Sequence, residues 1–192
     1  MTYRIRLALQ SDSPAATRVV GRVYEEYGFT WDSAGYHADL LDLEAHYLRA
    51  GLPFWVAELS EVVPRIVGTA ALDVFETVQG EPGTLVVLDG TRRVSGADCS
   101  LERLYVDPDA RRFGIGAAIF RVTIEEAKRR GRRRMEIWSD KRFVDAHRLY
   151  QRLGARILGD RICDDPDHSP EWGMGLALDS ELLGPGKANR RA

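Results

Sequence analysis

Hydrophobic and polar positions change their period several times along the chain, and each change marks a secondary-structure element. Residues 4–9 alternate as in a half-buried strand, and residues 13–27 then carry apolar side chains at helical spacing up to a glycine stop at Gly28. A second stretch with helical spacing covers residues 38–50 and predicts another helix. We expect further strands at 54–59, 66–75, 100–106, 135–139, 155–162 and 171–178, and further helices at 114–130 and 143–153.

This order of elements predicts an α/β fold with a mixed, mostly antiparallel central sheet flanked by helices. Residues 75–98 fit the order poorly, because they contain one short apolar run, 85–88, between two glycines. We therefore expect a single domain over residues 1–182, in which residues 75–98 are an insertion between strands that carries an extra strand. Residues 183–192 contain Gly, Pro and basic residues without periodicity, and we expect a flexible tail there.

Composition narrows the classes of function. The chain has 192 residues, with 44% hydrophobic and 29% charged residues and a net charge of −2, which is typical of a globular enzyme and gives no overall basic field for nucleic acid. We interpret the basic run 128–134 as the end of a helix, where positive side chains complement the helix dipole, rather than as a nucleic-acid site. No apolar run is long enough for a membrane span, and two cysteines indicate reduced thiols. We expect a cytoplasmic protein that binds neither nucleic acid nor membrane.

The most informative segment runs from Leu104 to Gly116. A strand ends at Pro108, which cannot donate to a sheet, and a short loop leads into a helix at Gly114. The first amides of a helix lack internal partners and lie at the positive end of its dipole, and glycines allow close approach of a ligand. The segment therefore predicts a pyrophosphate site, although neither the P-loop pattern nor the G-x-G-x-x-G pattern is present.

Two short motifs carry a family resemblance. Arg111-x-x-Gly114-x-Gly116 is similar to the acetyl-CoA signature of the GNAT family of N-acetyltransferases, and residues 146–154 resemble the family's second signature, with Ala155 in place of its final aromatic residue. The resemblance covers residues 101–154 in detail. It implies a GNAT-like fold and transfer of an acetyl group from acetyl-CoA to a primary amine of a small molecule, amino acid or peptide. It implies no metal, and leaves monomer and homodimer open. The alternative is a non-catalytic acyl-CoA-binding regulatory module on the same fold.

The resemblance also implies a cofactor site. The pantetheine arm would pair with the strand backbone at residues 104–106, and the pyrophosphate would meet the amides that follow Arg111. Arg111 would either contact phosphate or brace the loop. For the strand residues, the alternative is that their side chains only pack in the core. The expected cofactor-binding residues are Leu104, Tyr105, Val106, Arg111, Arg112, Phe113, Gly114, Ile115, Gly116 and Ala117.

Two catalytic residues follow from the same resemblance. Tyr150 occupies the position of a tyrosine that protonates the departing thiolate, and the alternative is that it only packs on its helix face. Glu102 lies on the strand before the pyrophosphate site, where a carboxylate could remove the amine proton; the alternative is an ion pair with Arg103 on a solvated face. Glu171 and Asp140 are weaker candidates for the base. The acidic segment 164–168 is interpreted as a solvated turn rather than a metal site.

Overall fold

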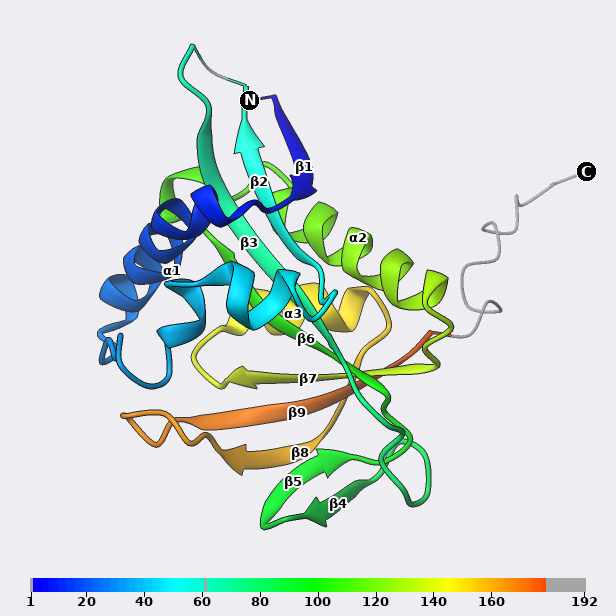
Figure 1. Ribbon diagram of the computed structural model, residues 1–192. Coiled ribbons are helices and arrows are strands. Elements are labelled where there is room, and N and C mark those ends of the chain that lie inside the picture. Colours follow the sequence, from blue (N-terminus) through cyan, green and yellow to red (C-terminus); the bar gives the residue numbers. More distant parts are fainter. Residues whose placement is uncertain (1, 61, 179–192) are drawn as a thin grey trace, which may run out of the picture.

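A seven-stranded sheet forms the centre of the protein, with strands in the order β1-β2-β3-β6-β7-β9-β8. The computed structural model describes residues 2–60 and 62–178 (Figure 1). All neighbouring strands are antiparallel except the parallel pair of β6 and β7. The strands are β1 Tyr3–Leu7, β2 Phe54–Leu59, β3 Arg65–Val74, β6 Cys99–Val106, β7 Arg134–Asp140, β8 Arg156–Ile162 and β9 Pro170–Ala177.

Helices cover both faces of this sheet and create two cores. On one face, α1 (Ser13–Tyr27) packs with residues 38–48 on Val56 and Ala71. On the other face, α2 (Ile115–Arg129) and α3 (Val144–Arg152) pack on neighbouring strand positions such as Ala57 and Ala70. Side chains alternate between the faces of a strand, so each strand at the centre of the sheet is buried on both sides. The α/β fold with a mostly antiparallel sheet flanked by helices is confirmed.

Strand β6 carries a bulge where it faces β3. Glu102 lies opposite Ala71 and Tyr105 lies opposite Thr69, so Arg103 and the next residue share one partner position on β3. Arg103 has a φ of 52°, and its carbonyl oxygen accepts a hydrogen bond of 2.8 Å from the Thr69 hydroxyl. A bulge bends its strand and increases the local twist. The second half of β6 is therefore directed away from β7.

The two parallel strands separate beyond this bulge. Their pairing runs from Cys99 opposite Met135 to Leu101 opposite Ile137 and stops there. Strand β6 nevertheless continues to Val106 and β7 to Asp140. Among the described residues, the edge of β6 that faces β7 therefore has no strand partner over residues 102–106. The result is a slot through the sheet, open toward α2 and α3 on one face and toward α1 on the other.

The prediction of a helix over residues 38–50 is wrong. A 3₁₀-turn at Ala38–Leu40 and a single π-helical turn at Glu44–Leu48 replace it. The reason is that side chains from the α1 region capture backbone amides: Ser13 Oγ accepts from the Leu43 amide at 3.4 Å and Gln10 Oε1 accepts from the Glu44 amide at 2.7 Å. The apolar periodicity still identifies the buried face, since Leu40, Leu43 and Tyr47 are buried.

The insertion between β3 and β6 contains two strands, not one. Strands β4 (Leu85–Leu88) and β5 (Thr91–Val94) form an antiparallel hairpin, with Asp89 and Gly90 at the turn in left-handed conformation.

The ends of the other predicted elements differ from the observed ends by at most two residues. None of the described helices is long and apolar enough to cross a bilayer. The predicted tail, residues 183–192, lies outside the described residues.

Candidate active site

A cavity of about 690 Å³ occupies the slot between β6 and β7. Its walls come from both faces of the sheet, because it reaches the N-terminus of α2 and Tyr150 of α3 on one side and Tyr24 and Tyr36 on the other. Glu102 lies in the same cavity. The structure thus brings together the two predicted catalytic residues and the predicted pyrophosphate site, although they are far apart in sequence.

Residues 112–117 form a set of free backbone donors, which we call the cradle. The first hydrogen bond of α2 runs from the Ala118 amide to the Gly114 oxygen at 3.0 Å, and within the described residues the amides of 112–117 have no acceptor. Arg112 and Gly114 adopt left-handed conformations, with φ values of 66° and 79°. Successive amides in alternating conformations at a helix N-terminus make a concave anion site. The cradle therefore fits a pyrophosphate group.

Most residues of the cradle line the cavity, and Phe113 is the exception. The cavity wall includes Arg112 and residues 114–117, whereas the Phe113 side chain is about half exposed outside it. A Cβ atom added to Gly116 would lie in ordinary contact, 3.5 Å from Val106 Cγ2 and 3.6 Å from Leu149 Cδ2. Gly116 thus leaves room between α2 and the end of β6, where a chain running along the strand would pass.

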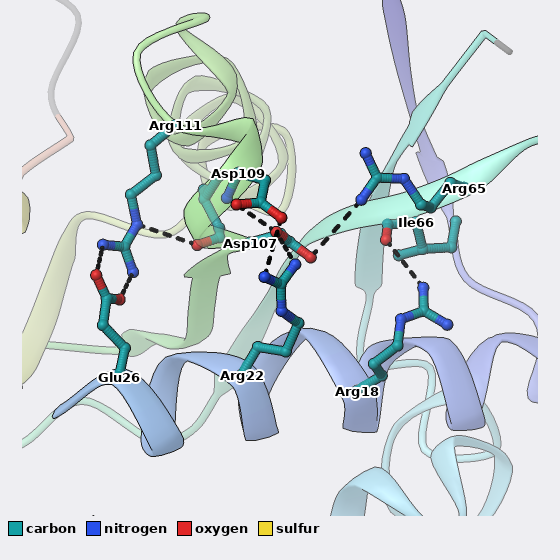
Figure 2. A network of polar contacts seen from close by, with 9 residues as sticks. Arg18, Arg22, Glu26, Arg65, Ile66, Asp107, Asp109 and Arg111 are labelled. Atoms are coloured by element: carbon teal, nitrogen blue, oxygen red, sulfur yellow. Dashed lines mark hydrogen bonds and ion pairs between the residues drawn. The ribbon is translucent and has the colours of Figure 1, made fainter. Parts of the chain in front are cut away.

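Ion pairs fasten the loop before the cradle to α1 (Figure 2). Arg22 bridges Asp107 at 2.7 Å and Asp109 at 2.9 Å, and the terminal nitrogens of Arg111 reach the carboxylate of Glu26 at 2.8 and 2.5 Å. Arg111 also donates to the Val106 oxygen at 3.3 Å. Of the two roles predicted for Arg111, the structure shows the bracing contact. Asp107 is almost fully buried, so its pair with Arg22 anchors the loop more firmly than the exposed contacts do.

Glu102 projects into the cavity and makes no ion pair with any described residue. Ser100 donates a hydrogen bond of 2.7 Å to its Oε1 atom. Its carboxylate is accessible from the cavity, but the surrounding protein removes much of its bulk hydration, and this desolvation raises the pKa of Glu102. The Ser100 hydrogen bond opposes that rise. A carboxylate with a raised pKa is better matched to accepting a proton from an ammonium ion.

The ion pair between Glu102 and Arg103, given above as the alternative to a role as base, does not form. Arg103 instead binds both carboxylate oxygens of Asp39 at 2.8 Å and donates to the Tyr36 carbonyl oxygen at 2.5 Å. Asp39 also accepts from the Tyr47 hydroxyl. This network ties residues 36–47 to the bulge of β6 and leaves the Glu102 carboxylate free for the cavity.

Tyr150 reaches the cavity from the face of the sheet that α2 and α3 cover. Its ring is 4% exposed and packs against Phe120 at a centroid distance of 5.1 Å. The hydroxyl has no hydrogen-bond partner among the described residues, although the side chain lines the cavity. Burial raises the pKa of Tyr150, with a smaller contribution from Tyr105, so the phenol keeps its proton at neutral pH. Tyr150 therefore packs in the core, and its protonated hydroxyl lines the cavity without a partner among the described residues.

Glu171 on β9 also lines the cavity. Arg161 donates to it at 2.8 Å, and desolvation raises the pKa of Glu171 while Arg161 opposes that rise. Aromatic rings of Phe29, Tyr36 and Tyr105 also line this side of the cavity. The sequence analysis named Tyr105 at the cofactor site but did not group the three rings, because they come from separate segments that only the fold brings to one cavity.

The remaining candidates have structural roles in the described residues. Asp140 pairs with Arg142 at 2.9 Å, and the ring of His147 contacts Ser139 Oγ at 3.2 Å. In the acidic segment 164–168, Asp165 accepts from the Ser169 amide and Asp167 accepts from Thr30, so these carboxylates order a loop. No cluster of three or more metal-ligating side chains occurs in the part of the chain that the structure describes.

Comparison with known proteins agrees with this geometry. Residues 20–155 match the Acetyltransferase (GNAT) family. The uncharacterized N-acetyltransferase YjgM of Escherichia coli (strain K12) is 31% identical over 152 residues, which cover 78% of each protein. The N-acetylaspartate synthetase of Rattus norvegicus is 30% identical over 148 residues, covering 77% of this chain and only 41% of the rat protein.

A solved structure extends the comparison to the fold. The structure of yncA, a putative acetyltransferase from Salmonella typhimurium with acetyl-CoA, superimposes with a TM-score of 0.66 at 20% sequence identity and covers 97% of this chain and 99% of its own. Its helices and sheet are arranged as described above. The chain belongs to the GNAT family of acetyltransferases.

Proposed function

We propose that this protein transfers an acetyl group from acetyl-CoA to a primary amine. The observation that carries the proposal is that Glu102, Tyr150 and the cradle share one cavity in a slot of the sheet. A site with an anion-binding end, a free carboxylate and an unpartnered phenol meets the needs of acyl transfer between a thioester and an amine. The solved relative with acetyl-CoA supports the choice of acyl donor.

The protein would hold the donor through its own backbone. The free amides of the cradle would bind the pyrophosphate, and the unpaired edge of β6 over residues 102–106 would hydrogen-bond an extended chain that carries amide groups. The bound donor would supply a thioester, an activated acyl group. Holding it beside the amine replaces a bimolecular encounter by a unimolecular step.

Glu102 would prepare the acceptor, and Tyr150 would complete the reaction. Glu102 would remove a proton from the ammonium group, directly or through water, and the free amine nitrogen would form a bond to the acyl carbon as the carbon–sulfur bond breaks. The nitrogen would then lose its surplus proton to solvent, which leaves a neutral amide. The electron pair of the carbon–sulfur bond remains on sulfur, and Tyr150 gives this thiolate a proton that solvent later restores. Glu171, paired with Arg161 at 2.8 Å, would help to shape the acceptor side of the cavity without adding net charge.

The acceptor would be a small molecule, an amino acid or a peptide amine. Aromatic rings and carboxylates together suit a cation, because a positive group is attracted to both ring faces and anionic oxygens. Cys99 and Cys163 are both free and buried, which supports a reducing compartment such as the cytoplasm.

The test is acetyl-CoA-dependent thiol release over a panel of amines, amino acids and peptides, with the product identified by mass spectrometry. An acetylated amine formed in step with free CoA is the expected result. Tight binding of acetyl-CoA without release beyond the no-amine rate for any acceptor would favour the non-catalytic acyl-CoA-binding alternative.

A further inference from the structure

A second cavity, of about 370 Å³, adjoins the active-site cavity on the α1 face of the sheet. The two cavities share Glu102, Trp138 and Arg161 in their walls. The second cavity, which we call the recess, continues from Glu102 toward Asp73 on β3 and Asp89 at the tip of the β4–β5 hairpin. An acceptor whose amine lies at Glu102 would thus have its remaining atoms beside the recess.

The hairpin that walls the recess is docked on the sheet at defined points. Gly159 on β8 has no side chain, and a Cβ atom there would lie 2.5 Å from Leu85 Cδ1, so Leu85 fits against the bare backbone. Arg92 donates to the Asp160 carbonyl oxygen at 2.6 Å, and the Val94 amide donates to Glu136 at 2.8 Å. These contacts hold the hairpin tip beside the active site as a fixed wall.

In the wall of the recess, the positive side chains have ion-pair partners and most of the negative ones do not. Of the two guanidinium groups of the recess, Arg93 pairs with Glu136 at 2.6 Å and Arg161 pairs with Glu171 at 2.8 Å, so both are already neutralised. Three carboxylates remain without an ion pair among the described residues, those of Asp73, Asp89 and Glu102. The closest contact of Asp73 is a 2.8 Å hydrogen bond from the Val74 amide. The uncompensated charge of the recess is therefore negative.

The shared wall also carries an unsatisfied donor. The indole Nε1 atom of Trp138 is buried and has no hydrogen-bond partner among the described residues. The ring lies over Gly173, where a Cβ atom would be 2.5 Å from it, and under the Arg161 guanidinium at 4.1 Å. A buried donor without a partner is costly unless a ligand or a water molecule supplies an acceptor.

We infer that the recess is the outer part of the acceptor site and takes a second cationic group of the acceptor. This inference rests on the proposed function and narrows its substrate class to diamines and other amines that carry a second positive charge. The reacting amine lies at Glu102, and the second cation lies between Asp73 and Asp89. An acceptor that carries a carboxylate in this position is disfavoured, because neither guanidinium group of the recess is free to pair with it. The bond that forms joins the amine nitrogen to the acyl carbon, and the bond that breaks is the carbon–sulfur bond of the thioester.

The test compares three acceptors with the same carbon chain: n-pentylamine, cadaverine and ω-aminovalerate, whose far ends are neutral, cationic and anionic. Thiol release is measured with saturating acetyl-CoA. We expect kcat/KM for cadaverine to exceed that for n-pentylamine by about tenfold, as for an ion pair in a partly enclosed site, and ω-aminovalerate to be the poorest acceptor. The preference falls at high salt, because screening weakens exposed charge pairs.

Variants then locate the effect. Asp73→Asn keeps an oxygen for the Val74 amide, and Asp89→Asn keeps a residue that tolerates the left-handed turn. The double variant is expected to reduce the cadaverine to n-pentylamine ratio to the statistical factor that follows from the two equivalent amino groups of cadaverine. Glu125→Gln removes one negative charge from the exposed surface of α2, as each single variant does from the recess, and is expected to leave the ratio unchanged.

The outcomes separate the two proposals. Turnover of n-pentylamine and cadaverine with kcat/KM values no further apart than that statistical factor in the wild-type protein would overturn the inference and leave the acetyltransferase function standing. A preference for cadaverine above that factor that survives in the double variant would overturn it as well. Acetyl-CoA binding with no thiol release for any acceptor would contradict the proposed function and remove the inference with it.

Discussion

Replacement of Tyr150 by phenylalanine separates the two roles of this side chain. The ring is 4% exposed and packs 5.1 Å from the ring of Phe120, and phenylalanine keeps that packing. The hydroxyl makes no hydrogen bond to any described residue, so its removal leaves no protein group without a partner. We therefore expect Tyr150→Phe to remove a proton donor and little else.

The expected magnitudes differ between stability and turnover. Because no protein hydrogen bond is lost, the free energy of unfolding should change by less than about 0.5 kcal/mol. Turnover should fall by roughly tenfold to a thousandfold, the range for loss of a positioned proton donor, which corresponds to about 1.4–4 kcal/mol in the activation free energy. Tyr150→Ala, in contrast, would empty a core position and cost about 3–5 kcal/mol of stability.

The assay is thiol release at saturating acetyl-CoA, with thermal unfolding and acetyl-CoA affinity measured on the same preparations. We expect kcat to fall while the affinity and the midpoint of unfolding stay near their wild-type values. An unchanged kcat would refute the reasoning, because solvent would then protonate the thiolate and Tyr150 would serve only to pack the core.

Two further variants test the acceptor side. Glu102→Gln should lower the rate most at low pH, where least free amine is present; a constant ratio to the wild-type rate across pH would count against Glu102 as the base. Because the pKa of Glu102 is raised in the folded state, the contribution of Glu102 to stability is lost as pH rises above the ordinary value of 4.5. Chemical unfolding should therefore show Glu102→Gln gaining stability relative to the wild type toward neutral pH, with no gain below that value. Arg103→Ala leaves the largely buried Asp39 without its bidentate partner and should cost about 3 kcal/mol in urea unfolding, against less than about 1 kcal/mol for the exposed Arg92→Ala; equal losses would contradict the reasoning.

Local patterns predicted most of the elements but not their hydrogen bonding. The helix expected at 38–50 fails because Ser13 and Gln10, which are distant in sequence, bind the amides of Leu43 and Glu44. No pattern within 38–50 reveals those partners. The hydrophobic spacing did identify the buried face, since spacing reports burial on either kind of helical turn.

The second strand of the insertion was predictable and was missed. Asp89-Gly90 directly after the apolar run 85–88 is a strong signal for a two-residue hairpin turn, because both residues tolerate left-handed conformation. The basic residues of β5, Arg92 and Arg93, concealed the alternation. Their structural reason is now clear, since they reach Asp160 and Glu136 and dock the hairpin.

The cavity depends on a feature that sequence does not show. Pairing between β6 and β7 stops at Leu101 opposite Ile137 because Arg103 forms a bulge, and its side chain is held by Asp39 from a distant segment. The motif around Gly114 predicted the free amides that the structure shows at the N-terminus of α2. The acceptor end combines residues from β3, β6, β7, β8, β9 and the hairpin, and only the fold brings them together.

The most direct test of the central claim is calorimetric titration of CoA into the wild-type protein and into Gly116→Glu. The claim is that the free amides of the cradle, residues 112–117, bind the cofactor's phosphates. A Cβ atom at Gly116 makes only ordinary contacts with the protein, and a glutamate there places a negative charge at the anion site. We predict measurable CoA binding to the wild-type protein and at least a hundredfold weaker binding, about 2.7 kcal/mol, to a variant with a wild-type circular dichroism spectrum. Wild-type affinity in Gly116→Glu would contradict the account and place the cofactor elsewhere.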